Sequence, residues 1–375
     1  MIRFNQPFLF GEELVYLNKA VADGRLSGNG DFTKRCHSFF ESRYGFNKVL
    51  LTTSCTDALE MAAILLDIKP GDEVIMPSFT FVSTSNAFVL RGANIVFADS
   101  EMNHPNIDAS LVESLITERT KALVVVHYGG VACDMDQIMT IAKKRNLFVV
   151  EDAAQAIDSY YKGRPLGSIG DLAAFSFHET KNVVSGEGGM LVVNTKRFAS
   201  RAEIIWEKGT NRSSFFRGEV DKYGWVDIGS SFLPSDLIAA YLFGQLEHLD
   251  EIQTRRLEIW NSYFDRLEKL QEKGLIRLPK VHSDATNNAH VFFLECGNIQ
   301  ERTKLLEQFK THGIGAVFHY LSLHKSPFYE QKHDGRRLPN ADRFADCLVR
   351  LPLHLHLTSS DIDQICDIIE EFYQC

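Results

Sequence analysis

The sequence has no paired cysteines, no excess of positive charge and no long apolar run. Its seven cysteines are scattered without a C-x-x-C pair, which argues against a disulfide scaffold or a zinc cluster, and thus against a metal site. The net charge of −9 argues against nucleic acid as a partner, but leaves room for a local basic site. No uncharged apolar stretch approaches the ~20 residues that span a bilayer. The N-terminus begins no signal peptide. We therefore expect a cytoplasmic protein with reduced thiols and no membrane partner.

What the chain does have is a regular alternation of short apolar runs with helical patterns. Its 375 residues suit one large and one smaller domain. Near-continuous apolar runs between helices predict an α/β fold with a mostly parallel sheet buried on both faces. The rhythm stops near residue 248, so we predict domains at 1–248 and 249–375, the second of α+β type. The seven runs are 49–52, 73–77, 95–98, 123–126, 147–150, 173–177 and 190–193.

Further elements flank this pattern. Residues 11–23 predict an amphipathic helix with Leu14, Leu17 and Val21 on one face, for which packing, a dimer contact included, is favoured over a catalytic role. A second helix is expected over 33–44 and long helices over 237–273. In the C-terminal part, we expect strands at 290–294 and 316–319 and helices at 301–311 and 360–373.

Polar residues follow several of the apolar runs, where a parallel sheet binds its ligands. Ser54, Cys55 and Thr56 precede the predicted helix 57–66, whose N-terminus suits a phosphate; simple N-capping is the alternative. Phe81 can stack on a planar ring or belong to the core.

The fifth run is followed by two acids and an amide. Asp152 suits a bound cation, with helix N-capping as the alternative, and Gln155 offers its amide. After the fourth run, His127 either lines the site or is a structural histidine.

Lys181 follows the sixth run and precedes a glycine-rich turn at 186–189. A lysine held in a pocket at such a corner loses its proton more easily and becomes an amine nucleophile. We therefore hypothesise that Lys181 carries a covalently bound aldehyde cofactor.

The segment 207–225 interleaves Lys and Arg with aromatic residues and glycine in an otherwise acidic chain. Such a segment suits a diphosphate and a stackable base. A solvated surface loop is the alternative.

Taken together, the motifs at 54–59, 80–81, 151–155, 175–178, 181 and 186–189 resemble the DegT/DnrJ/EryC1/StrS sugar aminotransferases over essentially the whole chain. The resemblance implies the aspartate-aminotransferase-like fold (fold type I of pyridoxal phosphate enzymes), with a seven-stranded sheet in the large domain. It implies pyridoxal 5′-phosphate as cofactor, with pyridoxamine phosphate as the intermediate form. It also implies a homodimer with shared active sites.

The resemblance implies roles for single residues. Lys181 would bind the cofactor covalently, Asp152 its ring nitrogen and Gln155 its ring hydroxyl, while Phe81 would stack on the ring. The phosphate would be held by Ser54, Cys55, Thr56 and Ser176. Two positions depart from the family: many members have Gly at Cys55, and many have Asn at Ser231, where it reaches the partner subunit's phosphate. The predicted substrate-binding residues are His178, Arg212, Lys222, Tyr223, His319 and Tyr320.

The motifs at 178–182, 208–213, 215–218, 221–223 and 227–231 are most similar to members that form dTDP-4-amino-4,6-dideoxy-D-galactose. This implies amino transfer from L-glutamate to C4 of dTDP-4-keto-6-deoxy-D-glucose, for enterobacterial common antigen or O-antigen in surface polysaccharide. Alternatives within the family are the gluco epimer and amination at C3. A non-catalytic regulator that binds pyridoxal phosphate is another alternative. Related sugar dehydratases typically have His at the position of Lys181.

Overall fold

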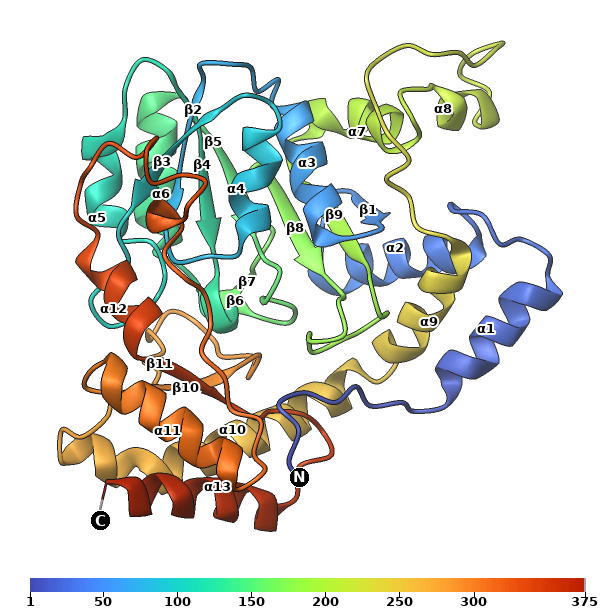
Figure 1. Cartoon of the computed structure of the whole chain (residues 1–375). Helices are drawn as coiled ribbons and strands as arrows, with labels where there is room; N and C mark the ends of the chain where they lie inside the picture. Colours follow the sequence, from blue (N-terminus) through green and yellow to red (C-terminus); the bar gives the residue numbers. More distant parts are fainter. Residues whose placement is uncertain (374–375) are drawn as a thin grey trace.

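A seven-stranded sheet forms the centre of the molecule (Figure 1). The computed structural model describes residues 1–373, so the predicted free thiol of Cys375 lies outside the described residues. The sheet order is β1-β9-β8-β5-β4-β2-β3, and only β9 runs against its neighbours. The predicted fold class is confirmed. The strands are β1 (Val49–Thr52), β2 (Glu73–Pro77), β3 (Asn94–Ala98), β4 (Thr120–Val126), β5 (Phe148–Asp152), β8 (Leu172–Ser176) and β9 (Gly189–Val193).

Helices cover both faces of this sheet, and successive strand residues point to opposite faces. Leu51 and Val125 pack in one buried cluster, whereas Leu50 and Val124 pack in the other. The first cluster contains residues of α2 (Asp31–Tyr44), α5 (Ala109–Val112), α6 (Met135–Arg145) and α9 (Asp236–Leu246). The second contains residues of α3 (Cys55–Leu65), α4 (Val82–Val89), α7 (Ala199–Trp206) and α12 (Pro339–Cys347). Burial on both faces explains why the runs are almost wholly apolar.

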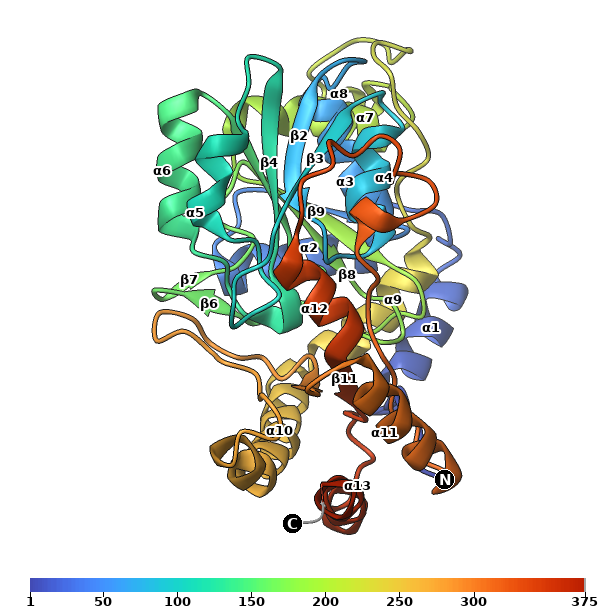
Figure 2. The same cartoon turned by 60° about the vertical axis from the view of Figure 1, so that its left-hand side comes forward.

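A third buried cluster belongs to the C-terminal part, which lies below the sheet in Figures 1 and 2. Ile2 joins this cluster because its backbone bonds Gly313 and Gly315, so the N-terminus packs on the C-terminal part. The predicted domain boundary near 248 falls between α9 and α10; the division itself stays a prediction. The elements of this part are α10 (Leu249–Glu272), β10 (Phe292–Glu295), α11 (Ile299–Thr311), β11 (Leu348–Leu351) and α13 (Ser359–Phe372).

Three small elements complete the fold. A two-stranded hairpin pairs β6 (Tyr160–Tyr161) with β7 (Arg164–Pro165), and the short helix α8 (Arg212–Phe216) interrupts the basic segment 207–225. No helix in the part of the chain that the structure describes is long and apolar enough to cross a membrane.

One sequence prediction is wrong. Residues 316–319 do not form a strand, because only Val317 pairs, as a single bridge with Arg350, and Phe318 is exposed. The predicted helix α1 (Glu12–Ala22) is confirmed. Leu14 and Val21 of its apolar face are exposed in the single chain, so a dimer contact through this face stays a prediction. The helix buries Glu13 and Ala20. Helix α12 and strand β11 lie outside the predicted elements.

Asp236 ties two helices together and provides a stability test. It is 2% exposed and accepts hydrogen bonds from the backbone N–H groups of Phe32 and Thr33 and from the Thr33 hydroxyl, thereby capping α2 from α9. We expect Asp236→Ala to lower the free energy of unfolding by about 3 kcal/mol, because three buried donors lose their acceptor. Urea denaturation measures this, and the exposed Glu268→Ala serves as control, with a change within about 0.5 kcal/mol. Equal losses in both variants would contradict the assigned cap.

Candidate active site

A cavity of about 570 Å³ opens at the carboxyl ends of the central strands. Residues from β5, β8, α3 and α4 line it, and the C-terminal part closes it from below. Eleven of the predicted site residues lie in its wall, so the structure brings together side chains that are far apart in sequence. They are Ser54, Cys55, Thr56, Phe81, Asp152, Gln155, Ser176, His178, Lys181, His319 and Tyr320.

Lys181 lies in a tight turn between β8 and β9. Its backbone N–H donates to the His178 carbonyl, and Gly186 adopts a φ of 80° where the turn reverses. A positive φ of this kind favours glycine. Burial lowers the pKa of Lys181, which the carboxylate of Asp152 opposes. The amine is therefore easier to deprotonate than an ordinary lysine, as a nucleophile or base requires.

Asp152 ends β5 and is 5% exposed. The Thr84 hydroxyl donates to its Oδ2 at 2.7 Å and the Ala154 N–H to its Oδ1 at 3.2 Å. No helix begins between β5 and β6, so the N-capping alternative is wrong. Burial raises the pKa of Asp152, and within residues 1–373 it forms no ion pair. A buried carboxylate of this kind stabilises a cation bound in the cavity.

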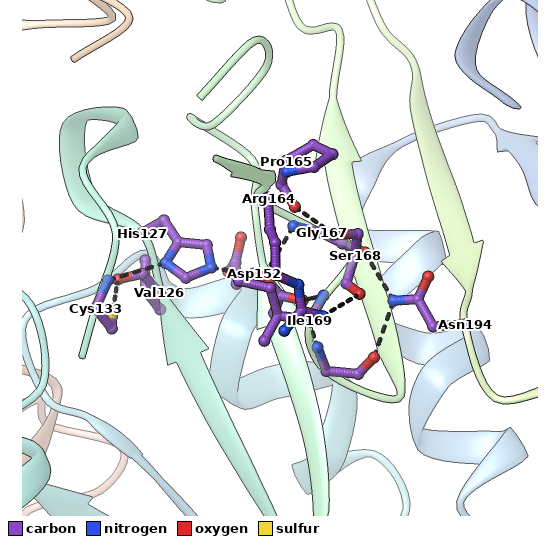
Figure 3. Close-up of polar contacts among 12 residues, drawn as sticks. Val126, His127, Cys133, Asp152, Arg164, Pro165, Gly167, Ser168, Ile169 and Asn194 are labelled. Atoms are coloured by element: carbon purple, nitrogen blue, oxygen red, sulfur yellow. Dashed lines mark hydrogen bonds and ion pairs between the residues drawn. The ribbon is translucent and has the colours of Figure 1, made fainter. Parts of the chain in front are cut away.

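The adjacent Glu151 has a structural role, and its partners His127, Gly167 and Ile169 are labelled in Figure 3. It is fully buried and accepts hydrogen bonds from the backbone N–H groups of Gly167, Ile169 and Gly170, and from His127 Nε2 at 2.9 Å. Burial alone would raise the pKa of Glu151, but these hydrogen bonds outweigh it and hold the pKa below its usual value. His127 is therefore a structural histidine and not a residue of the site. The His127–Glu151 pair anchors the end of β5, which carries Asp152.

The start of α3 forms an anion site. Ser54 caps the helix by accepting from the Asp57 N–H, and the first intrahelical bond runs from Ala58 to Ser54. The N–H groups of Cys55 and Thr56 precede that bond and lack intrahelical acceptors. Both residues line the cavity. Free N–H groups and the helix dipole favour a phosphate there, so capping and anion binding coexist.

Gly189 permits β9 to pass directly against this anion site. A Cβ atom added there would lie closer than 3.0 Å to the backbone of Ser54 and Cys55. We expect Gly189→Ala to raise the Kd of the phosphate-bearing cofactor about tenfold and to destabilise the fold by about 2 kcal/mol. Equilibrium titration and thermal unfolding measure these effects. Gly224→Ala, whose Cβ would meet nothing within 4 Å, is the control for stability. Unchanged affinity in Gly189→Ala would place the phosphate elsewhere.

Gln155 is held between two partners. Its Oε1 accepts from the Gly129 N–H at 2.6 Å and its Nε2 donates to the Tyr320 hydroxyl at 2.9 Å. One amide hydrogen remains for a ligand. Tyr320 stacks on His319 with ring centres 3.6 Å apart, while Phe81 is 55% exposed at the cavity wall.

Four predicted substrate or phosphate residues lie elsewhere. Arg212, Tyr223 and Ser231 line a second cavity between α2, α7 and α8, and Lys222 lines neither cavity. Within one chain, the structure does not bring these four residues to Lys181.

Sequence reasoning missed three basic residues of the Lys181 cavity: Arg256, His290 and Arg350. The available signal was Arg350, a single charge within the apolar run 348–353. His290 carries its proton on Nδ1, which donates to Asn182 Oδ1 at 2.9 Å. Burial lowers the pKa of His290 well below its usual value, so the ring is neutral.

The cavity offers a partner for each part of pyridoxal phosphate. The uncompensated carboxylate of Asp152 suits a ring nitrogen that carries a proton, the amides at the start of α3 suit the phosphate, and the amine of Lys181 suits the aldehyde. The residues present therefore fit this cofactor.

Comparisons with known proteins agree with this chemistry. The DegT/DnrJ/EryC1/StrS aminotransferase family matches residues 9–370. The spore coat polysaccharide biosynthesis protein SpsC of Bacillus subtilis (strain 168) is 33% identical, over 98% of this chain and 96% of its own. GDP-perosamine synthase of Escherichia coli O157:H7 is 32% identical, over 98% and 97%. The crystal structure of the aminotransferase TlmJ from Streptoalloteichus hindustanus superimposes with a TM-score of 0.91 at 30% identity, covering 100% of this chain and 99% of TlmJ.

The family match spans nearly the whole chain, and two relatives above 30% identity cover it almost end to end. The chain therefore belongs to the DegT/DnrJ/EryC1/StrS aminotransferase family and is a pyridoxal-phosphate-dependent sugar aminotransferase.

Proposed function

We propose that this enzyme transfers the amino group of L-glutamate to C4 of dTDP-4-keto-6-deoxy-D-glucose. The products are dTDP-4-amino-4,6-dideoxy-D-galactose and 2-oxoglutarate. The observation that carries the proposal is the single cavity that holds Lys181, Asp152 and the free amides of α3. The motifs of segment 208–231 supply the choice of sugar. We place the reaction in the cytoplasm, as a step toward a surface polysaccharide such as enterobacterial common antigen or O-antigen.

Each cofactor contact in this proposal is assigned to one side chain. Lys181 would hold pyridoxal phosphate through its amine, Asp152 would hold the ring nitrogen, and Gln155 the ring hydroxyl with its free amide hydrogen. Phe81 would cover one face of the ring. The phosphate would be bound by Ser54, Cys55, Thr56 and Ser176, which line the same cavity.

Pyridoxal phosphate supplies an electron-withdrawing ring that accepts the electron pair left when a C–H bond of an amino acid breaks. The side chains of the cavity control the protons in this reaction. Asp152, ionised, keeps a proton on the ring nitrogen. Lys181 Nζ moves the proton to and from the donor's α-carbon, for which its lowered pKa suits it. On the substrate side, we assign His178, His319 and Tyr320 to the sugar, since they line the same cavity.

We further propose that two copies of the chain share their active sites. The segment 208–231 lies apart from its own Lys181 cavity and exposes Phe216, Tyr223 and Trp225. Leu14 and Val21 of α1 are exposed as well. Apolar groups exposed in this number favour an interface. In a dimer, this segment would bring Arg212, Lys222, Tyr223 and Ser231 to the partner's cavity, where the first three bind the nucleotide diphosphate and Ser231 the cofactor phosphate.

The test of the reaction uses the purified, cofactor-loaded enzyme. With dTDP-4-keto-6-deoxy-D-glucose and L-glutamate, we expect stoichiometric 2-oxoglutarate and a 4-amino product whose NMR couplings report the galacto configuration. A gluco product or amination at C3 would replace the proposed sugar with one of the alternatives. Absence of any half-reaction with glutamate would contradict the proposed donor. Light scattering of the same sample measures the dimer.

One observation favours a second candidate for the nucleotide. GDP-perosamine synthase matches this chain end to end at 32% identity. The GDP-linked 4-keto-6-deoxy sugar is therefore tested in parallel. A higher kcat/KM for the GDP-linked sugar would change the assigned nucleotide and leave the amino transfer itself unaffected.

A further inference from the structure

Arg350 is a cation in the wall of the Lys181 cavity that no carboxylate accompanies. Its Nε is buried without a hydrogen-bond partner. Its Nη2 donates only a long bond, of 3.3 Å, to the Phe318 carbonyl, and its guanidinium lies 4.7 Å from the ring centre of Phe4. Within residues 1–373, no acidic oxygen lies within 4.0 Å of it. The guanidinium therefore keeps donors unused beside the cavity.

Arg91 and Arg302 also keep a buried Nε without a hydrogen-bond partner, but neither lines the Lys181 cavity. Other arginines are satisfied by acids or carbonyls. Arg343 pairs with Glu295, and Arg119 pairs with Glu73. Arg256, which lines the same cavity, lacks an acid too, but its Nε and Nη2 donate to the carbonyls of Ala289 and His290 at 3.0 and 2.8 Å. Removing a charge from water without a partner is costly, and burial lowers the pKa of Arg350. The protein itself supplies no partner that offsets the cost of burying the Arg350 charge at the cavity wall. This indicates that an anionic ligand supplies it.

The backbone holds Arg350 firmly in place. In β11 it pairs with Phe293 of β10, and on its other side it exchanges both backbone hydrogen bonds with Val317, at 2.7 and 3.1 Å. The guanidinium itself lies against Phe4 and bonds the Phe318 carbonyl, so its planar donors have a preset orientation, which suits the two oxygens of a carboxylate. The single bridge at Val317, which falls where sequence reasoning expected a strand, serves this anchoring.

The position of Arg350 relative to Lys181 indicates which anionic ligand it binds. The positive charge of Arg350 contributes to the lowered pKa of Lys181, so the two groups are electrostatically coupled. An amino acid carries its carboxylate on the same carbon as its amine, so a donor placed for reaction at Lys181 brings an anion into this cavity. The keto-sugar brings a neutral ring to Lys181 and keeps its diphosphate at the far end. The amides of α3 already provide for the cofactor phosphate.

We propose that Arg350 binds a carboxylate of the amino-acid donor. The inference rests on the proposed transfer from L-glutamate and adds the residue that recognises this donor. Arg350 then loses its bound carboxylate when 2-oxoglutarate leaves. In the second half-reaction it faces the uncharged sugar, to which it offers hydrogen bonds only.

The test separates the two half-reactions spectroscopically. Arg350→Gln loaded with pyridoxal phosphate is mixed with L-glutamate, and the same variant loaded directly with pyridoxamine phosphate is mixed with the keto-sugar. We expect the apparent KM for glutamate to rise about 10- to 100-fold, because a charge-assisted hydrogen-bond pair is lost. The sugar half-reaction should change less than about threefold. Arg350→Lys, which keeps the charge without the planar fork, should give an intermediate KM. Arg337→Gln, an exposed arginine outside this cavity, is the control.

The outcomes are distinguishable. If the wild-type enzyme shows no glutamate half-reaction, the proposed function fails. If wild type reacts and Arg350→Gln does so with an unchanged KM for glutamate, or loses the sugar half-reaction instead, the role of Arg350 is refuted alone. A measurement without mutation covers the case of an unfolded variant. Wild-type enzyme loaded with pyridoxal phosphate should bind glutarate at least tenfold more tightly than glutaramide by calorimetry; equal affinities overturn the proposal.

Discussion

Replacing Lys181 with alanine is expected to lower the rate of amino transfer by about 10⁴-fold, because the cavity then has no amine to bind the cofactor or to move the donor's α-proton. Among the residues that line this cavity, Lys181 is the only lysine in the described part of the chain. Its turn fixes it between β8 and β9, at the wall of the cavity. Steady-state kinetics with glutamate and keto-sugar measure the loss.

The covalent link provides a separate readout of the same substitution. Borohydride treatment of wild-type enzyme should fix the cofactor on the peptide that contains Lys181, and mass spectrometry should find no such adduct in Lys181→Ala. The exposed Lys269→Ala on α10 is the matched control and should label as wild type does. Equal labelling of the Lys181→Ala protein would refute the central assignment.

The sheet and the cofactor site follow closely from local sequence. Runs such as 123–126 are apolar without alternation because both faces of each strand are covered, and that pattern is legible in one sequence. Lys181 and Asp152 are polar residues directly after such runs, and parallel topology brings strand ends to one edge. For these positions, local pattern and tertiary placement agree.

Other positions depend on contacts that no local pattern encodes. The β-branched and aromatic residues 316–319 resemble a strand, yet only Val317 pairs and His319 turns into the cavity. Leu14 and Val21 form an apolar helix face that the chain does not cover by itself. Arg350 becomes informative only once folding shows that no acid reaches it. Partners distant in sequence, or on another chain, decide each of these cases.

Replacing Asp152 with asparagine is expected to have opposite effects on the empty and the loaded enzyme. Burial raises the pKa of Asp152 above that of an unfolded chain. The folded protein then binds more protons between the two pKa values, so its stability falls as pH rises from about 4 through the folded pKa. Above that window the ionised group destabilises the empty enzyme. Asparagine removes this penalty, and the Thr84 hydroxyl can turn toward Thr80, 2.9 Å away, to accept from the new amide.

In the loaded enzyme the same carboxylate faces the positive ring nitrogen, so the ionised Asp152 stabilises the protein instead of destabilising it. Losing one member of a buried ion pair costs about 3 to 5 kcal/mol, so Asp152→Asn should lower kcat about 10²- to 10³-fold and weaken cofactor binding. Thermal unfolding at pH 8 should therefore show the variant at least as stable as wild type when empty, and less stabilised by added pyridoxal phosphate. Glu151→Gln is the informative contrast, because Glu151 holds backbone amides rather than the cofactor and should destabilise both forms. If Asp152→Asn destabilised both forms equally, Asp152 would be a structural residue like its neighbour, and the ring nitrogen would need another partner.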